Sequence, residues 1–120
     1  MTVKAMAPVI KVSDIDKSET FYCAVLGFKN DGKFALTADG PFYLSLTDGR
    51  NFIHLSTFPG DSAYGIALYF DVDNVDTLYS RLQESDLGEI AMGPTNQTWG
   101  RREFYIKDPD GNRLAFGSKL

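Results

Sequence analysis

Few residues of this chain belong to the types that carry out catalysis or bind metals. His54 is the only histidine and Cys23 the only cysteine among its 120 residues. A catalytic histidine needs a cleft and an orienting partner, so the simpler interpretation of His54 is a strand residue whose ring is satisfied locally. Cys23 lies close to Phe21 and Val25, which indicates an inert core residue. No pair of acidic residues stands out as general acid and base, and no Gly-rich phosphate-binding sequence is present.

Trp99 is the residue whose position most suggests ligand binding. It lies in a stretch that contains Gly, Pro and Thr, directly before Gly100, Arg101 and Arg102, and outside any periodic apolar run. Core packing therefore does not require the indole, and a tryptophan on a loop can offer its flat face to a ligand. The alternative is that Trp99 only anchors the loop, and both interpretations stay open at this point.

Charge and composition restrict the partners of the chain. The net charge is −4, the isoelectric point is about 4.8, and the densest basic cluster is the Arg101-Arg102 pair. Nucleic-acid-binding surfaces usually carry a basic stripe, so no nucleic-acid partner is expected, whereas an acidic surface attracts cationic ligands. No segment approaches the ~20 apolar residues that span a bilayer, and the first residues do not resemble a signal peptide. With a single cysteine, these features predict a cytoplasmic protein that has no membrane partner.

A weak internal repeat organises the chain. The segment 12–16 resembles the segment 72–76, sixty residues later, and Asp48-Gly49-Arg50 resembles Asp110-Gly111-Asn112, sixty-two residues later. The length fits one domain, here residues 1–120 with an internal repeat of 1–60 and 61–120.

Each half is predicted to form a strand, a helix and three further strands. In the first half, Ser13 or Asp14 caps the helix and Gly27 ends it. In the second half, Val75 and Leu82 belong to one apolar helix face. The predicted strands are 9–12, 34–37, 42–47 and 51–57 in the first half, and 66–70, 90–92, 103–107 and 113–117 in the second.

Alternation along these strands assigns side chains to two faces. One face is bulky and apolar and is expected to pack under the helices; it carries Ile66, Leu68, Phe70, Phe104, Ile106, Leu114 and Phe116. The other face mixes small, polar and aromatic residues, which is typical of a concave ligand-binding wall; it carries Tyr43, Ser45, Ala67, Tyr69, Tyr105, Arg113 and Ala115. His54 alternates with Ile53 and is expected on the side opposite this wall.

Two segments carry a resemblance to a known family. One is 8–14 with Phe21-Tyr22 and Leu26-Gly27-Phe28, and the other is 99–104 followed by Asp108-Pro109-Asp110-Gly111-Asn112. Over nearly its whole length the chain resembles the vicinal oxygen chelate superfamily, and within it the bleomycin resistance proteins and their glyoxalase-like relatives. The resemblance implies an α+β fold of two paired β-α-β-β-β modules, whose curved mixed sheets surround a cavity with the helices on the outer face.

The resemblance also allows a test for the metal site of the enzymes in that superfamily. In those enzymes His and Glu side chains hold a divalent metal, and the four ligand positions fall here on Ala7, Ile53, Ala67 and Ala115. None of these side chains carries the imidazole or oxygen donor that such ions need. We therefore expect no metal, no other cofactor and no metal-dependent catalysis.

These observations together predict a non-catalytic binding protein of the bleomycin-resistance type. It would sequester a planar, cationic antibiotic in a crevice at the interface of a homodimer. By the resemblance, Trp99 lines the crevice and Phe34 helps to hold the planar part of the drug. The full set of expected ligand-binding residues is Phe34, Tyr43, Tyr69, Trp99, Gly100, Arg101, Arg102 and Tyr105.

Two alternatives accompany this interpretation. The first is a glyoxalase-like lyase or dioxygenase, against which the missing metal ligands argue. The second is a protein that binds an endogenous metabolite, which the sequence does not separate from a drug binder. Within the matched segment, Arg101 and Arg102 together exceed the single-residue spacing usual in the family, so one of the two arginines has no matching position.

Overall fold

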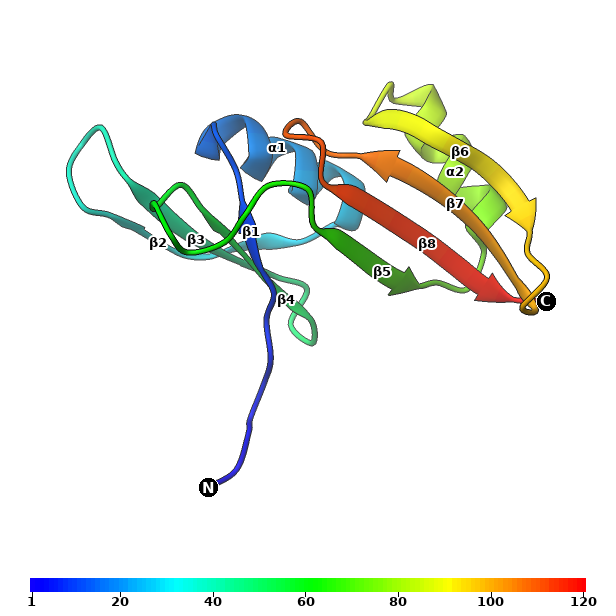
Figure 1. Cartoon of the computed structure of the whole chain (residues 1–120), viewed down its shortest axis with the longest axis horizontal. Helices are drawn as coiled ribbons and strands as arrows, with labels where there is room; N and C mark the ends of the chain where they lie inside the picture. Colours follow the sequence, from blue (N-terminus) through cyan, green and yellow to red (C-terminus); the bar gives the residue numbers. More distant parts are fainter. The chain divides into compact units, whose positions relative to one another are not determined.

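The computed structural model describes residues 1–120 and forms two compact units, residues 1–64 and 65–120. Each unit has the element order strand, helix and three strands, so the predicted α+β fold of two β-α-β-β-β modules is confirmed (Figure 1). The first unit contains β1 (Val9–Lys11), α1 (Ile15–Leu26), β2 (Lys29–Ala35), β3 (Phe42–Thr47) and β4 (Phe52–Ser56). The second unit contains β5 (Ala67–Asp71), α2 (Val75–Glu84), β6 (Glu89–Asn96), β7 (Arg101–Lys107) and β8 (Arg113–Lys119).

The two helices begin where their capping residues place them. The Asp14 side chain accepts a hydrogen bond from the Lys17 backbone N–H at 3.0 Å, and Asn74 does the same for Thr77 at 3.0 Å. Gly27 ends α1 in the left-handed conformation, at a φ of 71°, and its N–H donates to the Cys23 carbonyl. The predicted first helix is thereby confirmed, with Asp14 rather than Ser13 as its cap.

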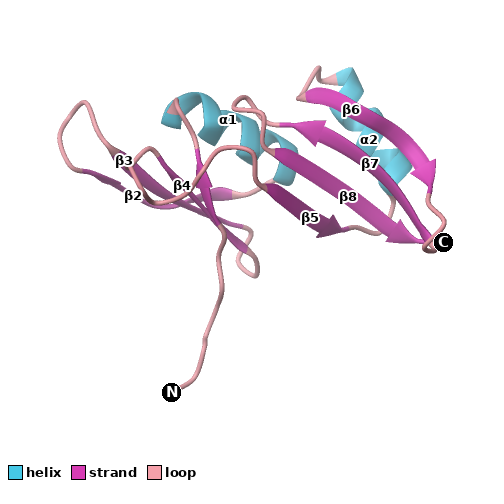
Figure 2. Ribbon diagram, in the orientation of Figure 1, coloured by secondary structure: helices cyan, strands magenta, loops and turns pink.

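Each unit contains one mixed four-stranded sheet. The strand orders are β1-β4-β3-β2 and β5-β8-β7-β6, and in both sheets the first pair is parallel and the other two are antiparallel. Each helix packs against one face of the sheet in its own unit (Figure 2). The opposite face of each sheet is not covered by a helix of that unit, and we call it the free face.

The helix-covered faces contain the cores. In the second unit Phe104 pairs with Phe116 and Ile106 with Leu114, and all four are buried, as the alternation predicted. Leu68 and Phe70 lie on the same face but are only half-buried, because β5 is an edge strand of its sheet. In the first unit the core residues of the sheet are Ile10, Leu44, Leu46, Ile53 and Leu55.

Two strands differ from their predicted bounds by more than two residues at one end. The strand predicted at 34–37 runs from Lys29 to Ala35, and every residue in it is exposed. It pairs with β3 without burying either face, so its sequence carries no apolar alternation that would reveal it. The strand predicted at 90–92 extends to Asn96 through Gly93 and Pro94, which an edge strand tolerates.

The predicted side of His54 is wrong. In the register of β3 and β4, Leu46 pairs with Ile53 and Ser45 pairs with His54. Paired residues share a face, so Ile53 is in the core, with 3% of its surface exposed, and His54 lies on the free face. The Tyr43 hydroxyl confirms this placement, since it lies 2.8 Å from Nδ1 of His54.

This error arose because the sixty-two-residue offset of the Asp-Gly match was applied to the strands that follow the turns. Thr47 pairs with Phe52 across the turn 48–51, whereas Lys107 pairs with Arg113 across the longer turn 108–112. The offset between the halves is therefore sixty residues before the turn and sixty-one after it. The counterpart of Ala115 in the first unit is His54, and not Ile53.

Candidate ligand-binding surface

Trp99 lies at the tip of the hairpin that joins β6 to β7. The Gln97 N–H donates to the Arg101 carbonyl at 2.7 Å, and the Gly100 N–H donates to the Gln97 carbonyl at 3.3 Å. Gly100 has a φ of 84°, a conformation that suits glycine and closes the turn. The hairpin leaves 62% of the Trp99 surface exposed. Trp99 is the only tryptophan in the chain.

A buried carboxylate lies beside Trp99 on the free face of the second sheet. Only 3% of the Glu103 surface is exposed. Its Oε2 accepts hydrogen bonds from the Tyr69 hydroxyl at 2.7 Å and from the indole Nε1 of Trp99 at 3.3 Å. Its Oε1 accepts from the Tyr105 hydroxyl at 3.1 Å. We refer to Tyr69, Trp99, Arg101, Glu103 and Tyr105 as the Glu103 cluster.

The Glu103 cluster holds this carboxylate in its ionised form. Burial alone would raise the pKa of Glu103, but the hydrogen bonds from Tyr69, Trp99 and Tyr105 and the positive charge of Arg101 outweigh it, so the pKa lies below its ordinary value. Burial and the neighbouring carboxylate raise the pKa of both tyrosines. The phenols therefore stay protonated and act as donors to an oxygen pair that can only accept.

The two adjacent arginines point to opposite faces of β7. Arg101 lies on the free face, where its Nε donates to the Tyr69 hydroxyl at 3.1 Å and its guanidinium pairs with Asp71. Arg102 lies on the helix-covered face and forms a two-point ion pair with Asp76 of α2, at 2.8 and 3.0 Å. Arg102 was expected among the ligand-binding residues, but its side chain does not share a surface with Trp99.

Arginine and tyrosine also meet at the other end of the free face. The guanidinium of Arg113 lies over the Tyr105 ring, with its Cζ 4.7 Å from the ring centroid. At the near end the Cζ of Arg101 lies 5.7 Å from the centroid of Tyr69. The free face of the second sheet therefore presents aromatic rings whose hydroxyls point at Glu103 and whose faces contact cationic side chains.

The first unit presents a second set of aromatic residues on its own free face. Phe34 pairs with Tyr43 in the register of β2 and β3 and stacks on Phe58, with a centroid distance of 6.1 Å. Phe34 is 56% exposed. The Tyr43 hydroxyl contacts His54, and burial followed by the charge of Asp61 raises the pKa of this tyrosine. Phe34 and Tyr43 are thus neighbours in the first unit, as Tyr69, Trp99, Arg101 and Tyr105 are in the second.

The residues at the four metal-ligand positions cannot bind a divalent metal. With the corrected register these positions hold Ala7, His54, Ala67 and Ala115, so a single imidazole is the only donor among them. No group of three or more His, Cys, Asp or Glu side chains is placed to bind a metal anywhere in the structure. Divalent ions at protein sites need several such donors.

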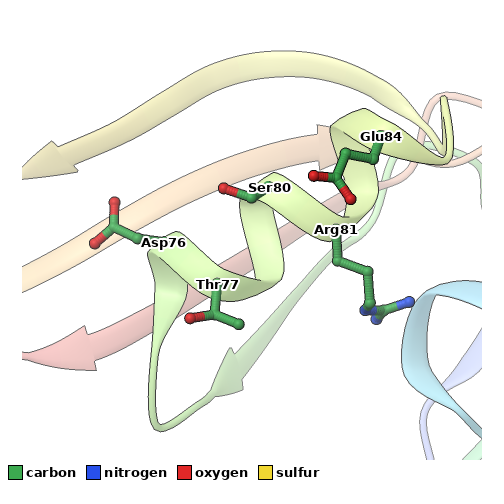
Figure 3. A pocket seen from close by; sticks show the side chains of 5 residues that line it. All are labelled: Asp76, Thr77, Ser80, Arg81 and Glu84. Atoms are coloured by element: carbon green, nitrogen blue, oxygen red, sulfur yellow. The ribbon is translucent and has the colours of Figure 1, made fainter.

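The pocket on the outer side of α2 is a separate feature. Its lining consists of Asp76, Thr77, Ser80, Arg81 and Glu84, all from one helix. Figure 3 shows that these side chains spread along the helix and do not converge on one point. Because Asp76 is already paired with Arg102, we assign no ligand to this pocket.

Glu103 is the member of the cluster that the sequence analysis missed. The signal was present in the alternation, because Glu103 precedes Tyr105 by two residues and so faces the same side of β7. An acidic residue within a strand of buried apolar neighbours is itself unusual, since unpaired carboxylates are rarely buried. The sequence could not show that the Tyr69 hydroxyl, from another strand, donates a hydrogen bond to this carboxylate.

Fold and site together define a class of α+β proteins built from two β-α-β-β-β modules. The model of the Glyoxalase/Bleomycin resistance protein/Dioxygenase superfamily matches residues 5–116, and the chain belongs to this superfamily. The resemblance drawn from the two sequence segments is thereby confirmed.

Curated relatives and solved structures agree with this membership. Bleomycin resistance proteins from Geobacillus stearothermophilus and Staphylococcus aureus are 26% identical to the chain over 125 aligned residues, which cover 94% of this chain and 95% of each relative. The structure of TnmS3, an antibiotic binding protein from Streptomyces sp. CB03234, is 27% identical, covers 99% of this chain and 98% of that one, and has a TM-score of 0.78. The lactoylglutathione lyase from Agrobacterium tumefaciens, at 19% identity and a TM-score of 0.73 over 98% of this chain and 96% of that one, shares the fold.

Neither helix of the structure has the length and apolar character that would let it cross a membrane.

Proposed function

We propose that the protein is a non-catalytic binder of the bleomycin-resistance type, which sequesters a planar, cationic antibiotic. The observation that carries the proposal is the exposed Trp99 indole, held at a hairpin tip beside the Tyr69 ring, which is itself 51% exposed. Exposed aromatic rings of this kind favour a flat ligand that can stack on them. The names of the bleomycin resistance proteins and of the antibiotic binding protein TnmS3 point to the same class of ligand.

We propose a set of ligand-binding residues on the free face of each sheet, one set for each unit. In the second unit they are Tyr69, Trp99, Gly100, Arg101 and Tyr105. In the first unit they are Phe34 and Tyr43, which pair across β2 and β3. Arg102 is left out because its guanidinium is engaged by Asp76 and Asn96 on the opposite face.

Protection by such a protein requires tight binding and no chemical step. The side chains of the proposed site support this assignment, because the only carboxylate in the Glu103 cluster already accepts three hydrogen bonds. The only histidine has its Nδ1 engaged by Tyr43 and has no carboxylate bonded to its ring. Glu103 is buried beneath the groups that donate to it, and His54 lacks the carboxylate partner that orients the imidazole in many catalytic pairs.

We further propose that the binding crevice is completed in a homodimer, with Phe34 of one chain and Trp99 of the other on its walls. Each sheet has two edge strands, β1 and β2 in the first unit and β5 and β6 in the second. Open edges of this kind are commonly covered by pairing with another chain. The exposed rings of Phe34 and Trp99 would then be shielded in part by the partner.

A thermal-shift panel tests the proposal. Bleomycin-type glycopeptides, divalent metals and common metabolites are added separately to the purified protein. A ligand present at 100 times its Kd stabilises the folded state by ~2.7 kcal/mol, which raises the melting temperature by several degrees. A shift with bleomycin supports the proposal, whereas a shift only with a metabolite would assign the protein to the alternative class of metabolite binders.

A further inference from the structure

We infer that Glu103 is the positioning residue of the Trp99 indole: it fixes the orientation of the aromatic wall without contacting the ligand itself. The inference rests on the proposed function, in which Trp99 contacts the ligand. It adds a residue, a role and a mechanism that neither the family membership nor the exposed indole supplies.

The first argument is that few contacts can fix the orientation of the Trp99 side chain. The side chain is 62% exposed, so packing contacts cover a minority of its surface. Its single polar atom, Nε1, donates to Oε2 of Glu103 at 3.3 Å. An indole N–H can only donate, so its orientation depends on an acceptor in a fixed place.

The second argument is that the acceptor itself is fixed. Glu103 projects from β7, and its two oxygens are held by Tyr69 of β5 and by Tyr105 of β7. Tyr69 is held in turn by the Nε of Arg101, whose guanidinium pairs with Asp71. The carboxylate is thus held by residues of two strands, whereas the indole that it orients lies on a hairpin tip.

The third argument excludes the obvious rival role, a direct contact between Glu103 and a cationic ligand. The carboxylate is 3% exposed, and its cover consists of the residues that donate to it. A cation could reach Oε1 or Oε2 only by displacing Tyr69, Tyr105 or Trp99. Glu103 therefore acts on the ligand through the indole.

The two roles predict different results for two substitutions. Glu103→Gln removes the charge but keeps a carbonyl oxygen that can accept from Trp99 and Tyr69, while its amide can donate to the Tyr105 oxygen, which also accepts. Glu103→Leu keeps the approximate volume but removes every acceptor. A positioning role is therefore rescued by Gln and lost with Leu, whereas a direct charge contact is lost with both.

The experiment measures Trp99 in the free protein and ligand affinity separately. Emission and acrylamide quenching of the single tryptophan are recorded without ligand, and the Kd for a bleomycin-type glycopeptide is measured by calorimetry. Asp76→Asn is the matched control, because it likewise converts a hydrogen-bonded carboxylate of this unit to an amide. Asp76 lies on α2, pairs with Arg102 and does not touch Trp99.

For Glu103→Leu we expect altered emission, more efficient quenching and an affinity about fivefold weaker, the equivalent of one typical hydrogen bond. Glu103→Gln and Asp76→Asn should stay close to the unchanged protein in both measurements. If Glu103→Gln weakens binding more than tenfold and leaves Trp99 emission unchanged, Glu103 contacts the ligand and the inference is overturned. That comparison needs only the Gln variant, so it remains decisive if the Leu variant does not fold.

Two further outcomes separate the inference from the proposed function. An unchanged Trp99 signal and unchanged affinity in a folded Glu103→Leu protein would overturn the positioning role while leaving the antibiotic-binding proposal intact. If the unchanged protein binds no bleomycin-type glycopeptide but Glu103→Leu still alters Trp99 emission, the positioning of the indole stands and the proposed ligand class is wrong.

Discussion

The hydroxyl of Tyr69 fills the space beside Gly117 that any larger residue would need. An ideal Cβ at Gly117 would overlap that hydroxyl, and it would lie 2.8 Å from Cζ of Tyr69 and 3.2 Å from Cγ of Glu103. The glycine is required here for space, since its backbone does not adopt a positive φ. Its missing side chain allows Tyr69 and Glu103 to meet at 2.7 Å.

Gly117→Ala should therefore disrupt the Glu103 cluster. The added methyl group pushes the Tyr69 phenol away from Glu103, and overpacking of this kind lowers the free energy of unfolding by about 1–3 kcal/mol. Gly93→Ala is the matched control on β6, where an ideal Cβ meets only Tyr79, at 3.6 Å. Urea denaturation should place the control within about 0.5 kcal/mol of the unchanged protein. Equal effects of the two substitutions would show that the space beside Gly117 is not limiting.

The environment of Trp99 should respond to acid and stay constant near neutral pH. The pKa of Glu103 in the folded protein lies below its ordinary value of 4.5. The stability that this carboxylate contributes is therefore present above pH 4.5 and is lost as the pH falls below it. Trp99 emission should be flat from pH 8 to pH 5 and change only under more acidic conditions. A transition centred between pH 5 and pH 7 would mean that burial raises the pKa of Glu103.

The protein should bind no divalent metal at the ligand positions of the superfamily enzymes. These positions hold Ala7, His54, Ala67 and Ala115, which together offer one imidazole. Elemental analysis of untagged protein should find well below one metal per chain, and a chelator should leave the melting temperature unchanged. About one Zn, Ni, Fe or Mn ion per chain would contradict this.

A homodimer is expected in solution. The edge strands of both sheets and the exposed rings of Phe34 and Trp99 are the surfaces that pairing would cover. Sedimentation at micromolar protein concentration should give twice the chain mass of 13.3 kDa. A single species at the chain mass would remove the dimer crevice from the proposed site.

The sequence predicted those parts of the fold that local chemistry determines. The cap at Asp14, the stop at Gly27 and the apolar face of α2 each depend on a few neighbouring residues, and all three are present in the structure. The strand β2 was displaced in the prediction because it is exposed on both faces and so carries no alternation. The position of His54 was missed because the Asp-Gly match gives an offset of sixty-two residues, whereas the strands after the turns are sixty-one residues apart. A one-residue error in the offset reverses the side of every residue in the strand.

The candidate site could be predicted only in part. Trp99 and Tyr105 were found because a loop indole and an alternating tyrosine are visible in the sequence itself. The role of Glu103 depends on contacts between strands that lie far apart along the chain, as in its bond with Tyr69. The opposite directions of Arg101 and Arg102 follow from strand geometry, but the partner that each one finds depends on the packing of α2 and the pairing of β5.

Titration of the unchanged protein and of Trp99→Ala with a bleomycin-type glycopeptide tests the central claim most directly. Stacking on an indole contributes roughly 0.5–1.5 kcal/mol beyond area burial, and a desolvated cation over the ring about 2 kcal/mol. We expect saturable quenching or a blue shift of Trp99 emission, and an affinity about tenfold weaker or more in Trp99→Ala. The variant should lose little stability, because the indole is largely exposed. The account would be contradicted by a glycopeptide that binds by calorimetry, leaves the Trp99 emission of the unchanged protein unaltered, and binds Trp99→Ala with the same affinity.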